Sequence, residues 1–283
     1  SVFAVSSVPF VSSDAVSLSV CVVDVQFYGA GGDDDLLGGI GADTITGGAG
    51  ADVIQGQGGF DRITGNADDD LIQGRGGDDT LSGNAGADWV DGNDGDDSVN
   101  GGTQNDTVVG GLGSDVLSGG EAQDVLVSGE LLADPLTTGE LDNIRDGETL
   151  ADASGIALGD TVFLSDDGAA DTLDGGNASD VLCFGAGDTA TGGNGTDDFG
   201  IIANSAGNGL GEALITDYTD GEDELFIVLD DLGPNAAAPL VTVVDDGADA
   251  VISLGGEVLA RVAGGAGVVT ASQIALTTGV ETT

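Results

Sequence analysis

The chain has 283 residues, of which 53 are glycine and 51 are Asp or Glu, and its only basic residues are four arginines. Because histidine is absent, a Ser-His-Asp triad, a Cys-His pair and a His-ligated zinc, copper or iron site are excluded. The formal net charge of −47 repels phosphate, which makes nucleic acid and anionic membranes poor partners.

The same charge opposes compaction, yet 40% of the residues are hydrophobic, which is too many for a disordered acidic polymer. We therefore expect a cation to neutralise the chain. The available donors are carboxylates and backbone carbonyls, which match calcium first among the hard cations. No long apolar run of the kind that spans a bilayer is present, so no transmembrane segment is expected.

Residues 1–28 are rich in Val, Ser and Phe, and the alternation over residues 16–22 predicts a strand. Two interpretations stay open: a cap over the first turn of the repeats, or a strand that adds to a neighbouring molecule. The segment lacks the positive region of an N-terminal secretory signal. Cys21 and Cys183 form one long-range disulfide or stay as two buried thiols.

Residues 29–127 are eleven consecutive nonapeptides without an insertion. The first position is always glycine, the eighth is always Leu, Ile or Val, and the sixth is always aspartate. This pattern predicts a glycine turn followed by a three-residue strand whose middle side chain points inward. The aspartates, which we predict to be metal ligands, are Asp34, Asp43, Asp52, Asp61, Asp70, Asp79, Asp88, Asp97, Asp106, Asp115 and Asp124.

One nonapeptide buries a single aliphatic side chain and cannot fold alone, whereas stacked repeats share a continuous core, so we predict a β-solenoid. A solenoid held by its hydrophobic ladder alone is the alternative to a metal-bound one. Carboxylates stacked at a strand spacing of about 4.8 Å would repel one another strongly without ions between them.

Units such as residues 38–46 (GGIGADTIT) and 47–55 (GGAGADVIQ) resemble the RTX (repeats-in-toxin) nonapeptide. The resemblance implies an all-β fold, a parallel β-roll with β-rich N- and C-terminal caps, in which two nonapeptides make one turn. Aspartates two repeats apart then form two columns with calcium between stacked loops, nine ions in this tract. Position four is Asp68, Gln104 or Ala122 instead of glycine in three repeats, and this weakens the sites beside those loops.

Residues 128–165 break the period, and we expect a long excursion with a helical turn or short strands. A second, shorter tract follows over residues 166–200, with Asp171, Asp180 and Asp197 as further predicted metal ligands. Within this tract, residues 184–191 form a repeat that is one residue short, so calcium binding there is less certain than in the first tract.

Residues 201–283 contain four predicted strands, at 213–218, 224–229, 240–244 and 250–254. This arrangement is similar to the C-terminal region of serralysin-like RTX proteins. That similarity implies a β-rich cap with an uncleaved secretion signal, export by the type I secretion machinery, and an extracellular or cell-surface location.

The repeats and flanks fill the 283 residues, so we expect no enzymatic activity and a structural role: copies of the chain assembling into a filament, matrix or surface layer. The alternative is a non-catalytic module of a larger secreted hydrolase or adhesin that aids delivery or stability, or binds carbohydrate or a surface. A carboxylate-only glycosidase is chemically possible, but no Asp or Glu pair stands out from the repeats. An ice-binding solenoid lacks the expected regular Thr-x-Thr columns.

Overall fold

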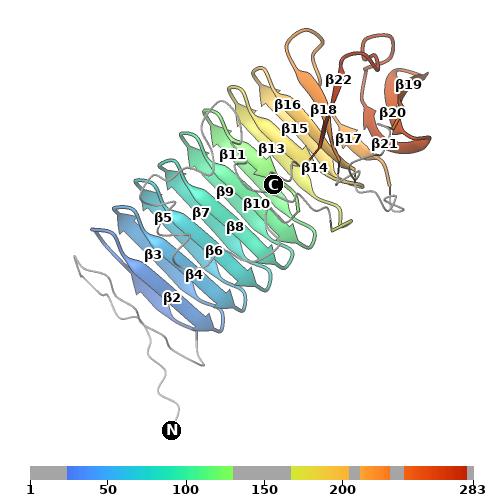
Figure 1. Ribbon diagram of the computed structural model, residues 1–283. Helices are drawn as coiled ribbons and strands as arrows, with labels where there is room; N and C mark the ends of the chain where they lie inside the picture. Colours follow the sequence, from blue (N-terminus) through green and yellow to red (C-terminus); the bar gives the residue numbers. More distant parts are fainter. Residues whose placement is uncertain (1–23, 130–166, 204–210, 230–238, 279–283) are drawn as a thin grey trace, which may run out of the picture.

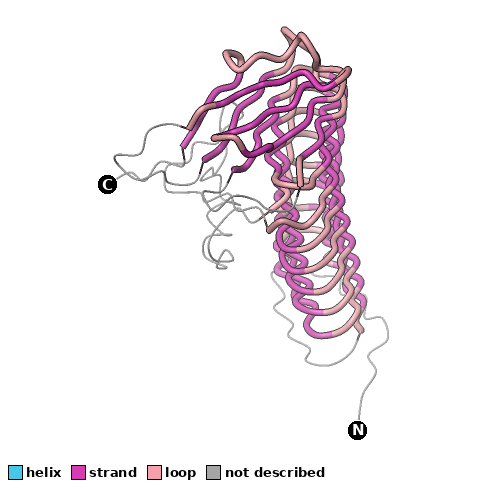
Figure 2. The backbone as a smooth tube through the Cα atoms, turned by 90° about the vertical axis from the view of Figure 1, so that its right-hand side faces the viewer, coloured by secondary structure: helices cyan, strands magenta, loops and turns pink. Residues whose placement is uncertain are grey.

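The computed structural model describes residues 24–129, 167–203, 211–229 and 239–278. These residues form two sheets that face each other along one long coil (Figures 1 and 2). The prediction of an all-β fold, a parallel β-roll, is confirmed. In the described part of the chain there is no helix able to cross a membrane.

Successive strands alternate between a ten-stranded and a twelve-stranded sheet, and neighbours in the roll are parallel. In the first tract each residue pairs with the equivalent residue two repeats later, as Leu36 does with Ile54. The strands are β1 (Gln26–Tyr28), β2 (Asp35–Ile40), β3 (Thr44–Ala49), β4 (Val53–Gly58), β5 (Arg62–Ala67), β6 (Leu71–Gly76), β7 (Thr80–Ala85), β8 (Trp89–Asp94), β9 (Ser98–Thr103), β10 (Thr107–Leu112), β11 (Val116–Glu121), β12 (Val125–Val127), β13 (Thr172–Asn177), β14 (Val181–Phe184), β15 (Thr189–Asn194), β16 (Asp198–Ala203), β17 (Ala213–Ile215), β18 (Glu224–Leu229), β19 (Val241–Asp246), β20 (Asp249–Leu254), β21 (Glu257–Val262) and β22 (Ile274–Thr278).

Most strands of the first tract are twice as long as expected, so the prediction of three-residue strands is wrong. The pairing continues through the glycines that open the next repeat: the Gly29 amide donates to the Thr46 carbonyl (2.9 Å) and the Ala30 amide to the Gly47 carbonyl (2.8 Å). Small residues at these positions let adjacent turns approach closely. At Gly56, which opens a repeat, a side chain would collide with the Asp61 carboxylate and lie 2.9 Å from the carbonyl oxygen of Gly74 in the adjacent turn.

The eighth residue of every nonapeptide lies in the roll interior, as its aliphatic character predicts. These side chains form one continuous cluster that also includes Val25 and Phe27, so the roll begins before the first complete repeat. Residues 1–23, where the cap or assembly strand was expected, lie outside the described residues.

The second repeat tract stacks directly on the first. Val116 of β11 pairs with Thr172 of β13, and Leu126 of β12 pairs with Leu182 of β14. Strands two repeats apart pair in the uninterrupted roll, so residues 129–166 are an insertion into a continuous solenoid. The expected helical turn or strands of that excursion fall outside the described residues.

The C-terminal segment extends both sheets. Strand β18 adds to β16, β22 adds to β18, and the strands β21, β20 and β19 continue the twelve-stranded sheet beyond β17 (Figure 1). All four strands expected here from the sequence are present, although β17 stops at Ile215.

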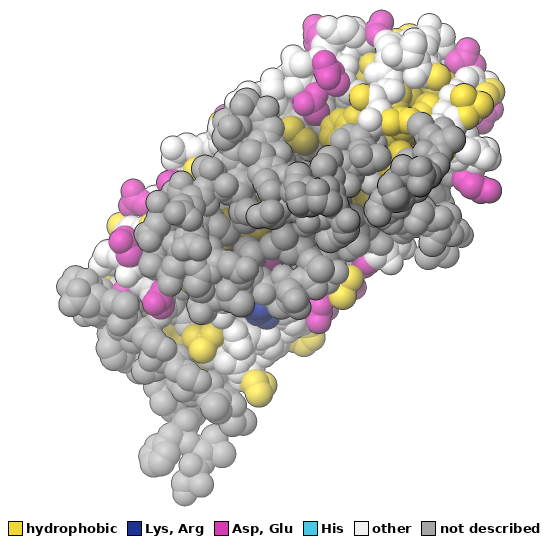
Figure 3. Space-filling view, viewed as in Figure 1, with side chains coloured by type: hydrophobic (Ala, Val, Ile, Leu, Met, Phe, Trp, Pro, Cys, Tyr) yellow, Lys and Arg dark blue, Asp and Glu magenta, His cyan; other side chains and the backbone are white. Residues whose placement is uncertain are grey.

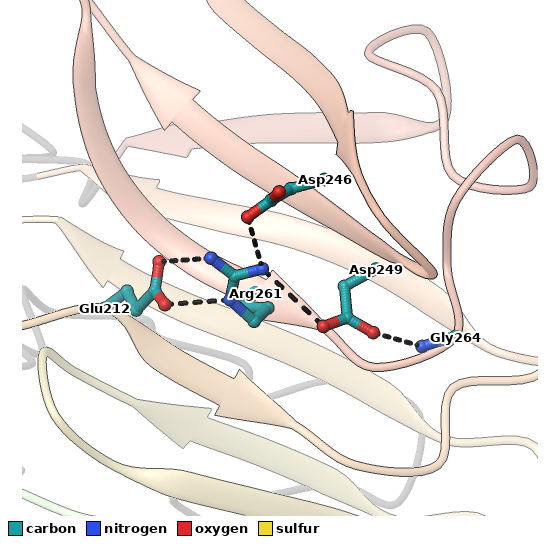
Figure 4. A network of polar contacts seen from close by, with 5 residues as sticks. All are labelled: Glu212, Asp246, Asp249, Arg261 and Gly264. Carbon is teal, nitrogen blue, oxygen red and sulfur yellow. Dashed lines mark hydrogen bonds and ion pairs between the residues drawn. The ribbon is translucent and has the colours of Figure 1, made fainter.

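A single guanidinium joins these last strands. Arg261 of β21 donates to Glu212 (2.8 Å) and Asp246 (3.1 Å), and it forms an ion pair with Asp249 at 3.6 Å (Figure 4). Asp249 in turn accepts the Gly264 amide at 3.0 Å. One of the four arginines of the chain thus compensates three carboxylates at this end of the roll.

Truncation of a core isoleucine tests how far the aliphatic ladder stabilises the roll. We expect Ile72→Ala, at a fully buried side chain, to lower the free energy of unfolding by about 2–5 kcal/mol. The matched control, Ile40→Ala, removes the same atoms from a side chain that is 67% exposed and should change it by less than about 0.5 kcal/mol. Urea unfolding in calcium measures both, and equal losses would contradict an interior ladder.

Candidate metal sites

The aspartates at position six lie where the chain passes from one sheet to the other, along the two edges of the roll. All fourteen predicted ligands are at most 3% exposed. They form two rows, which we call the first column (Asp34, Asp52, Asp70, Asp88, Asp106, Asp124, Asp180, Asp197) and the second column (Asp43, Asp61, Asp79, Asp97, Asp115, Asp171).

One hydrogen bond repeats down each column. The backbone amide of each aspartate donates to Oδ1 of the aspartate one turn later, as Asp52 does to Asp70 at 2.9 Å. The first tract contains nine such stacked pairs, five in the first column and four in the second. The bond also crosses the insertion, from Asp115 to Asp171 at 2.7 Å.

The second carboxylate oxygen has no such partner. In thirteen of the fourteen aspartates, all except Asp197, Oδ2 is buried without a hydrogen bond. In the repeats that open with glycine, it lies close against that glycine, where no side chain would fit. A carbon at the Cβ position of Gly38 would lie 2.5 Å from Asp43 Oδ2 and 2.7 Å from the carbonyl oxygen of Gly56 in the stacked loop.

The same arrangement recurs across the insertion and in the second tract. At Gly110 such a carbon would lie 2.5 Å from both Asp115 Oδ2 and the Ser128 carbonyl oxygen. At Gly175 it would lie 2.7 Å from Asp180 Oδ2 and 2.6 Å from the Gly192 carbonyl oxygen. A carboxylate oxygen and a carbonyl oxygen therefore converge between successive loops, which is the donor set that calcium prefers.

These donors fit calcium better than a transition metal. Over the described ranges, no three His, Cys, Asp or Glu side chains converge on one point. An ion between the loops would therefore be held by backbone carbonyls together with carboxylates from the columns, and oxygen-only ligation of this kind suits a hard cation.

Burial is the main influence on the charge of the columns. Desolvation raises the pKa of Asp52 to about 6 and of Asp70 to about 8, and the bond from the preceding amide opposes this only in part. Neighbouring carboxylates of the same column raise the pKa of Asp70 and Asp106 further. A folded roll without counter-ions thus favours protonated aspartates, and a bound cation would reverse that preference.

Sequence reasoning missed two aspartates that end the columns. Asp188 follows Asp171 and accepts its amide at 3.0 Å, and Asp223 follows Asp197 and accepts its amide at 2.9 Å. Their second oxygens accept the amides of Gly185 (2.7 Å) and Thr219 (2.6 Å). Because backbone amides satisfy both oxygens, neither carboxylate has the unpartnered oxygen that characterises the rest of the columns.

Weak signals for both residues exist in the sequence. Asp188 ends the stretch GAGD within the shortened repeat, and Asp223 stands between Gly221 and Leu225 with the spacing of positions four, six and eight. Neither residue fits the nine-residue pattern fully, because the repeat of Asp188 is one residue short and the repeat of Asp223 lacks its opening glycine.

A second, exposed set of side chains at position five also joins the loops. Asp69 Oδ1 accepts the Ala87 amide at 2.7 Å and Asn105 Oδ1 accepts the Gln123 amide at 3.2 Å. These bonds run in the opposite direction to those of the columns, since here the later loop donates. The sequence analysis assigned no role to this position.

The three repeats without glycine at position four keep the turn. Asp68, Gln104 and Ala122 adopt φ values of 73°, 80° and 81°, within the left-handed region that glycine occupies in most other repeats. A non-glycine residue there costs roughly 1–2 kcal/mol. These three residues therefore have strained backbone conformations, but the hydrogen bonds between stacked aspartates continue through their loops.

Cys183 is a free thiol and is fully buried. Burial raises its pKa to about 12, so the thiol is protonated and unreactive at neutral pH. Cys21, with which a disulfide was one of two alternatives, lies outside the described residues.

Comparison with known proteins agrees with this geometry. The model of the RTX calcium-binding nonapeptide repeat (4 copies) matches residues 28–63, 55–90, 64–99, 91–126 and 163–189. The chain therefore contains an RTX β-roll, and the sequence-based resemblance is confirmed for the repeats. RTX nonapeptides generally bind calcium, which agrees with the oxygen donors that the columns bring together. The likeness of the C-terminal region to serralysin-like proteins remains a prediction.

Among solved structures, the chain is similar to the extracellular lipase LipA from Serratia marcescens, at 18% identity and a TM-score of 0.22. The match covers 77% of this chain, which spans 40% of the lipase. No curated protein matches the sequence.

Replacement of one column aspartate tests the ligand assignment. Asp70→Asn keeps an oxygen for the Asp52 amide but removes the charge, so we expect the calcium concentration at the folding midpoint to rise by about tenfold and fewer ions to bind. Asp69→Asn is the matched control, because Asn105 already makes the equivalent bond. Isothermal titration and circular dichroism measure both; similar shifts in the two variants would contradict the assignment.

The raised pKa values predict how the calcium-free roll responds to pH. The folded pKa values of about 6 to 8 exceed the ordinary value of 3.8. Protonation of these aspartates therefore stabilises the calcium-free roll fully below about pH 4, and this contribution is lost as the pH rises through about 6 to 8. We expect the chelated protein to unfold at lower urea concentration at pH 8 than at pH 5. In calcium, protons compete with the ion, so the calcium midpoint should rise on acidification. Stability of the chelated protein that is constant from pH 5 to 8 would contradict the burial of these groups.

Proposed function

We propose that this chain is an extracellular calcium-dependent β-roll protein with a structural role, which folds on binding calcium and associates with copies of itself. One observation carries the proposal: thirteen buried aspartates, stacked in two columns, each hold a carboxylate oxygen without a hydrogen-bond partner. In the described part of the chain the ion pairs are all made by Arg261, far from most of these loops.

Coupling of folding to calcium follows from the charge of the columns. Bound calcium would supply the positive charge between stacked loops. Without it, ionised aspartates one turn apart repel each other and the extended chain separates them, so low calcium favours the unfolded chain. Acidic side chains are also spread over the visible surface, with hardly any Lys or Arg (Figure 3).

An extracellular location suits such sites. Extracellular calcium modules bind at roughly 10⁻⁴ to 10⁻³ M, which keeps the chain unfolded in a calcium-poor cytosol and folds it outside. Export as an unfolded chain by the type I secretion machinery is part of this proposal. In this proposal the chain crosses the exporter in its unfolded state and forms the roll only afterwards.

The ends of the roll support self-association. Among the described strands, β2 pairs only with β4 and β1 only with β3, so one edge of each remains without a described neighbour. An unpaired parallel edge offers backbone groups to another chain. Ile40 at the end of β2 and Tyr28 at the end of β1 are large exposed hydrophobic side chains at this end of the roll.

No catalytic role is included in the proposal. Most aspartates with raised pKa values are distributed along the two columns, and each column member has a position in the stacking. Burial also raises the pKa of Asp91 in β8 and of Asp198 in β16, which lie outside the columns. A raised pKa in the column aspartates is therefore accounted for by burial in the loops.

Calcium titration with two readouts tests the proposal. We expect circular dichroism to show β-structure forming with calcium, and light scattering and electron microscopy to show ordered polymers that dissolve in chelator. Magnesium is the control cation, because its smaller, strictly octahedral shell suits these loops less.

The two parts of the proposal fail separately. A roll that folds equally well in chelator would contradict calcium-dependent folding. A calcium-folded monomer at every concentration would contradict assembly and would favour the alternative of a delivery or surface-binding module. Loss of polymers on deletion of residues 1–23, with folding retained, would assign assembly to the N-terminal end.

A further inference from the structure

The insertion interrupts one nonapeptide, and the roll fixes both of its ends to the same loop. Ser128 stands at position one, where the eleven repeats of the first tract have glycine, and position six of the same repeat is Asp171, beyond the insertion. The Gly111 amide donates to the Ser128 carbonyl at 3.1 Å, and the Gly113 amide donates to Asp167 Oδ2 at 2.7 Å. The chain therefore leaves the roll and returns to it beside a single loop.

The turns on the two sides of the insertion stack like neighbouring turns elsewhere in the roll. The Thr172 amide donates to the Asp115 carbonyl at 2.9 Å, and the Val181 amide donates to the Asp124 carbonyl at 2.8 Å. Strands β11 and β13 lie side by side in the twelve-stranded sheet (Figure 1). The break in the repeat sequence thus causes no break in the stack.

Two pairs of aspartates connect the tracts across this junction. The Asp115 amide donates to Asp171 in the second column, and the Asp124 amide donates to Asp180 in the first column at 2.8 Å. In both pairs, each Oδ2 atom is buried without a hydrogen bond. Asp115 and Asp124 are 1% exposed, the same as Asp52 in a loop remote from the insertion, so the stacking of the loops accounts for their burial.

Backbone carbonyls add a second kind of donor at both places. A carbon at the Cβ position of Gly119 would collide with Asp124 Oδ2 and would lie 2.7 Å from the carbonyl oxygen of Gly175. In the second column, the Ser128 carbonyl oxygen lies beside Asp115 Oδ2 in the same way. Asp124 and Gly175 come from opposite sides of the insertion, so neither tract alone holds all the donors of this site.

We propose that two calcium ions bind at these junction sites and hold the two repeat tracts together. The donors are the carboxylates of Asp115, Asp124, Asp171 and Asp180 and the carbonyls of Ser128 and Gly175. The inference rests on the proposed calcium dependence of the roll and adds a specific role for two of the ions. The nonapeptide pattern along the chain does not give these sites, because the repeat on which they depend is split.

An ion at the junction changes the balance between two opposing effects. Without ions, the ionised carboxylates of the two tracts repel each other across the junction. Bound cations turn this repulsion into attraction, which offsets the entropy lost when the two ends of the insertion are held together. Calcium thus joins two separable parts of the roll, and the peptide chain of the insertion is not needed to keep them together.

Cutting the chain within the insertion tests this role. A recognition sequence for a specific protease is inserted after Gly139 in the full chain, the protein is cleaved in chelator and urea, and the product is returned to calcium. We expect the two fragments to form one particle of the size of the uncut protein in calcium and to separate in chelator. Analytical ultracentrifugation measures their association, and circular dichroism measures their folding.

Substitutions distinguish the junction from the rest of the columns. Asp124→Asn keeps an oxygen for the Asp106 amide but removes the charge beside Gly175. We expect the dissociation constant of the two fragments in saturating calcium to rise by roughly tenfold, and Asp115→Asn should act alike through the second site. Asp52→Asn is the matched control, because it makes the same change in the first column but lies wholly within the N-terminal fragment, so the dissociation constant should stay unchanged.

A count of bound ions gives a readout that does not depend on cleavage. In the uncut chain, the double variant Asp115→Asn with Asp124→Asn should hold two fewer calcium ions than the unaltered chain, as measured by native mass spectrometry. An unchanged count would show that the junction binds no metal, which would overturn the proposal.

The cut protein can also contradict the proposal. Fragments that fold in calcium but stay apart, or that remain joined in chelator, would show that calcium does not connect the tracts. Equal dissociation constants for Asp124→Asn and Asp52→Asn would place the connection elsewhere in the stack. The proposed function fails separately, through a roll that folds in chelator. In that case the fragments still separate on chelation if the junction ions join them.

Discussion

Each loop of this roll is positioned by a buried carboxylate. The aspartate at position six accepts the amide of the aspartate one turn earlier, as Asp70 does from Asp52 at 2.9 Å, and this single bond sets the stacking of the loops. The same bond forces like charges into columns away from water. Burial and proximity both disfavour the ionised state, so the geometry that builds the roll also creates its need for a cation.

The buried carboxylates have two kinds of surroundings in this protein. Along most of the roll, Oδ2 faces a carbonyl oxygen of the stacked loop and lacks a hydrogen bond, which suits a bound ion. At the C-terminal end, backbone amides satisfy both oxygens of Asp188 and Asp223, and Arg261 pairs with three further carboxylates. The proposed dependence on calcium therefore concerns the repeats, because at the C-terminal end the chain's own donors pair with these carboxylates.

The solenoid also separates its two faces. Alternate nonapeptides go to alternate sheets, so side chains two repeats apart form one face and the intervening repeats form the other. Outward side chains of the twelve-stranded sheet include Thr44 and Arg62, whereas those of the ten-stranded sheet include Leu71 and Trp89. The candidate calcium sites along the edges and the side chains on the two faces are thus built from different positions of the same repeat.

The sequence by itself determined the repeat, the aliphatic position eight and the fourteen aspartates, because a period of nine is a local pattern that copies itself. That two repeats make one turn, so that the aspartates form two columns, was implied by the resemblance to the RTX nonapeptide, and the strand pairing agrees with it. Only the tertiary structure decided that the roll continues across the insertion, from Asp115 to Asp171, and that Asp188 and Asp223 end the columns. These features depend on which turns of the roll stack on each other. Such contacts join residues far apart in the chain and leave no fixed spacing in the sequence.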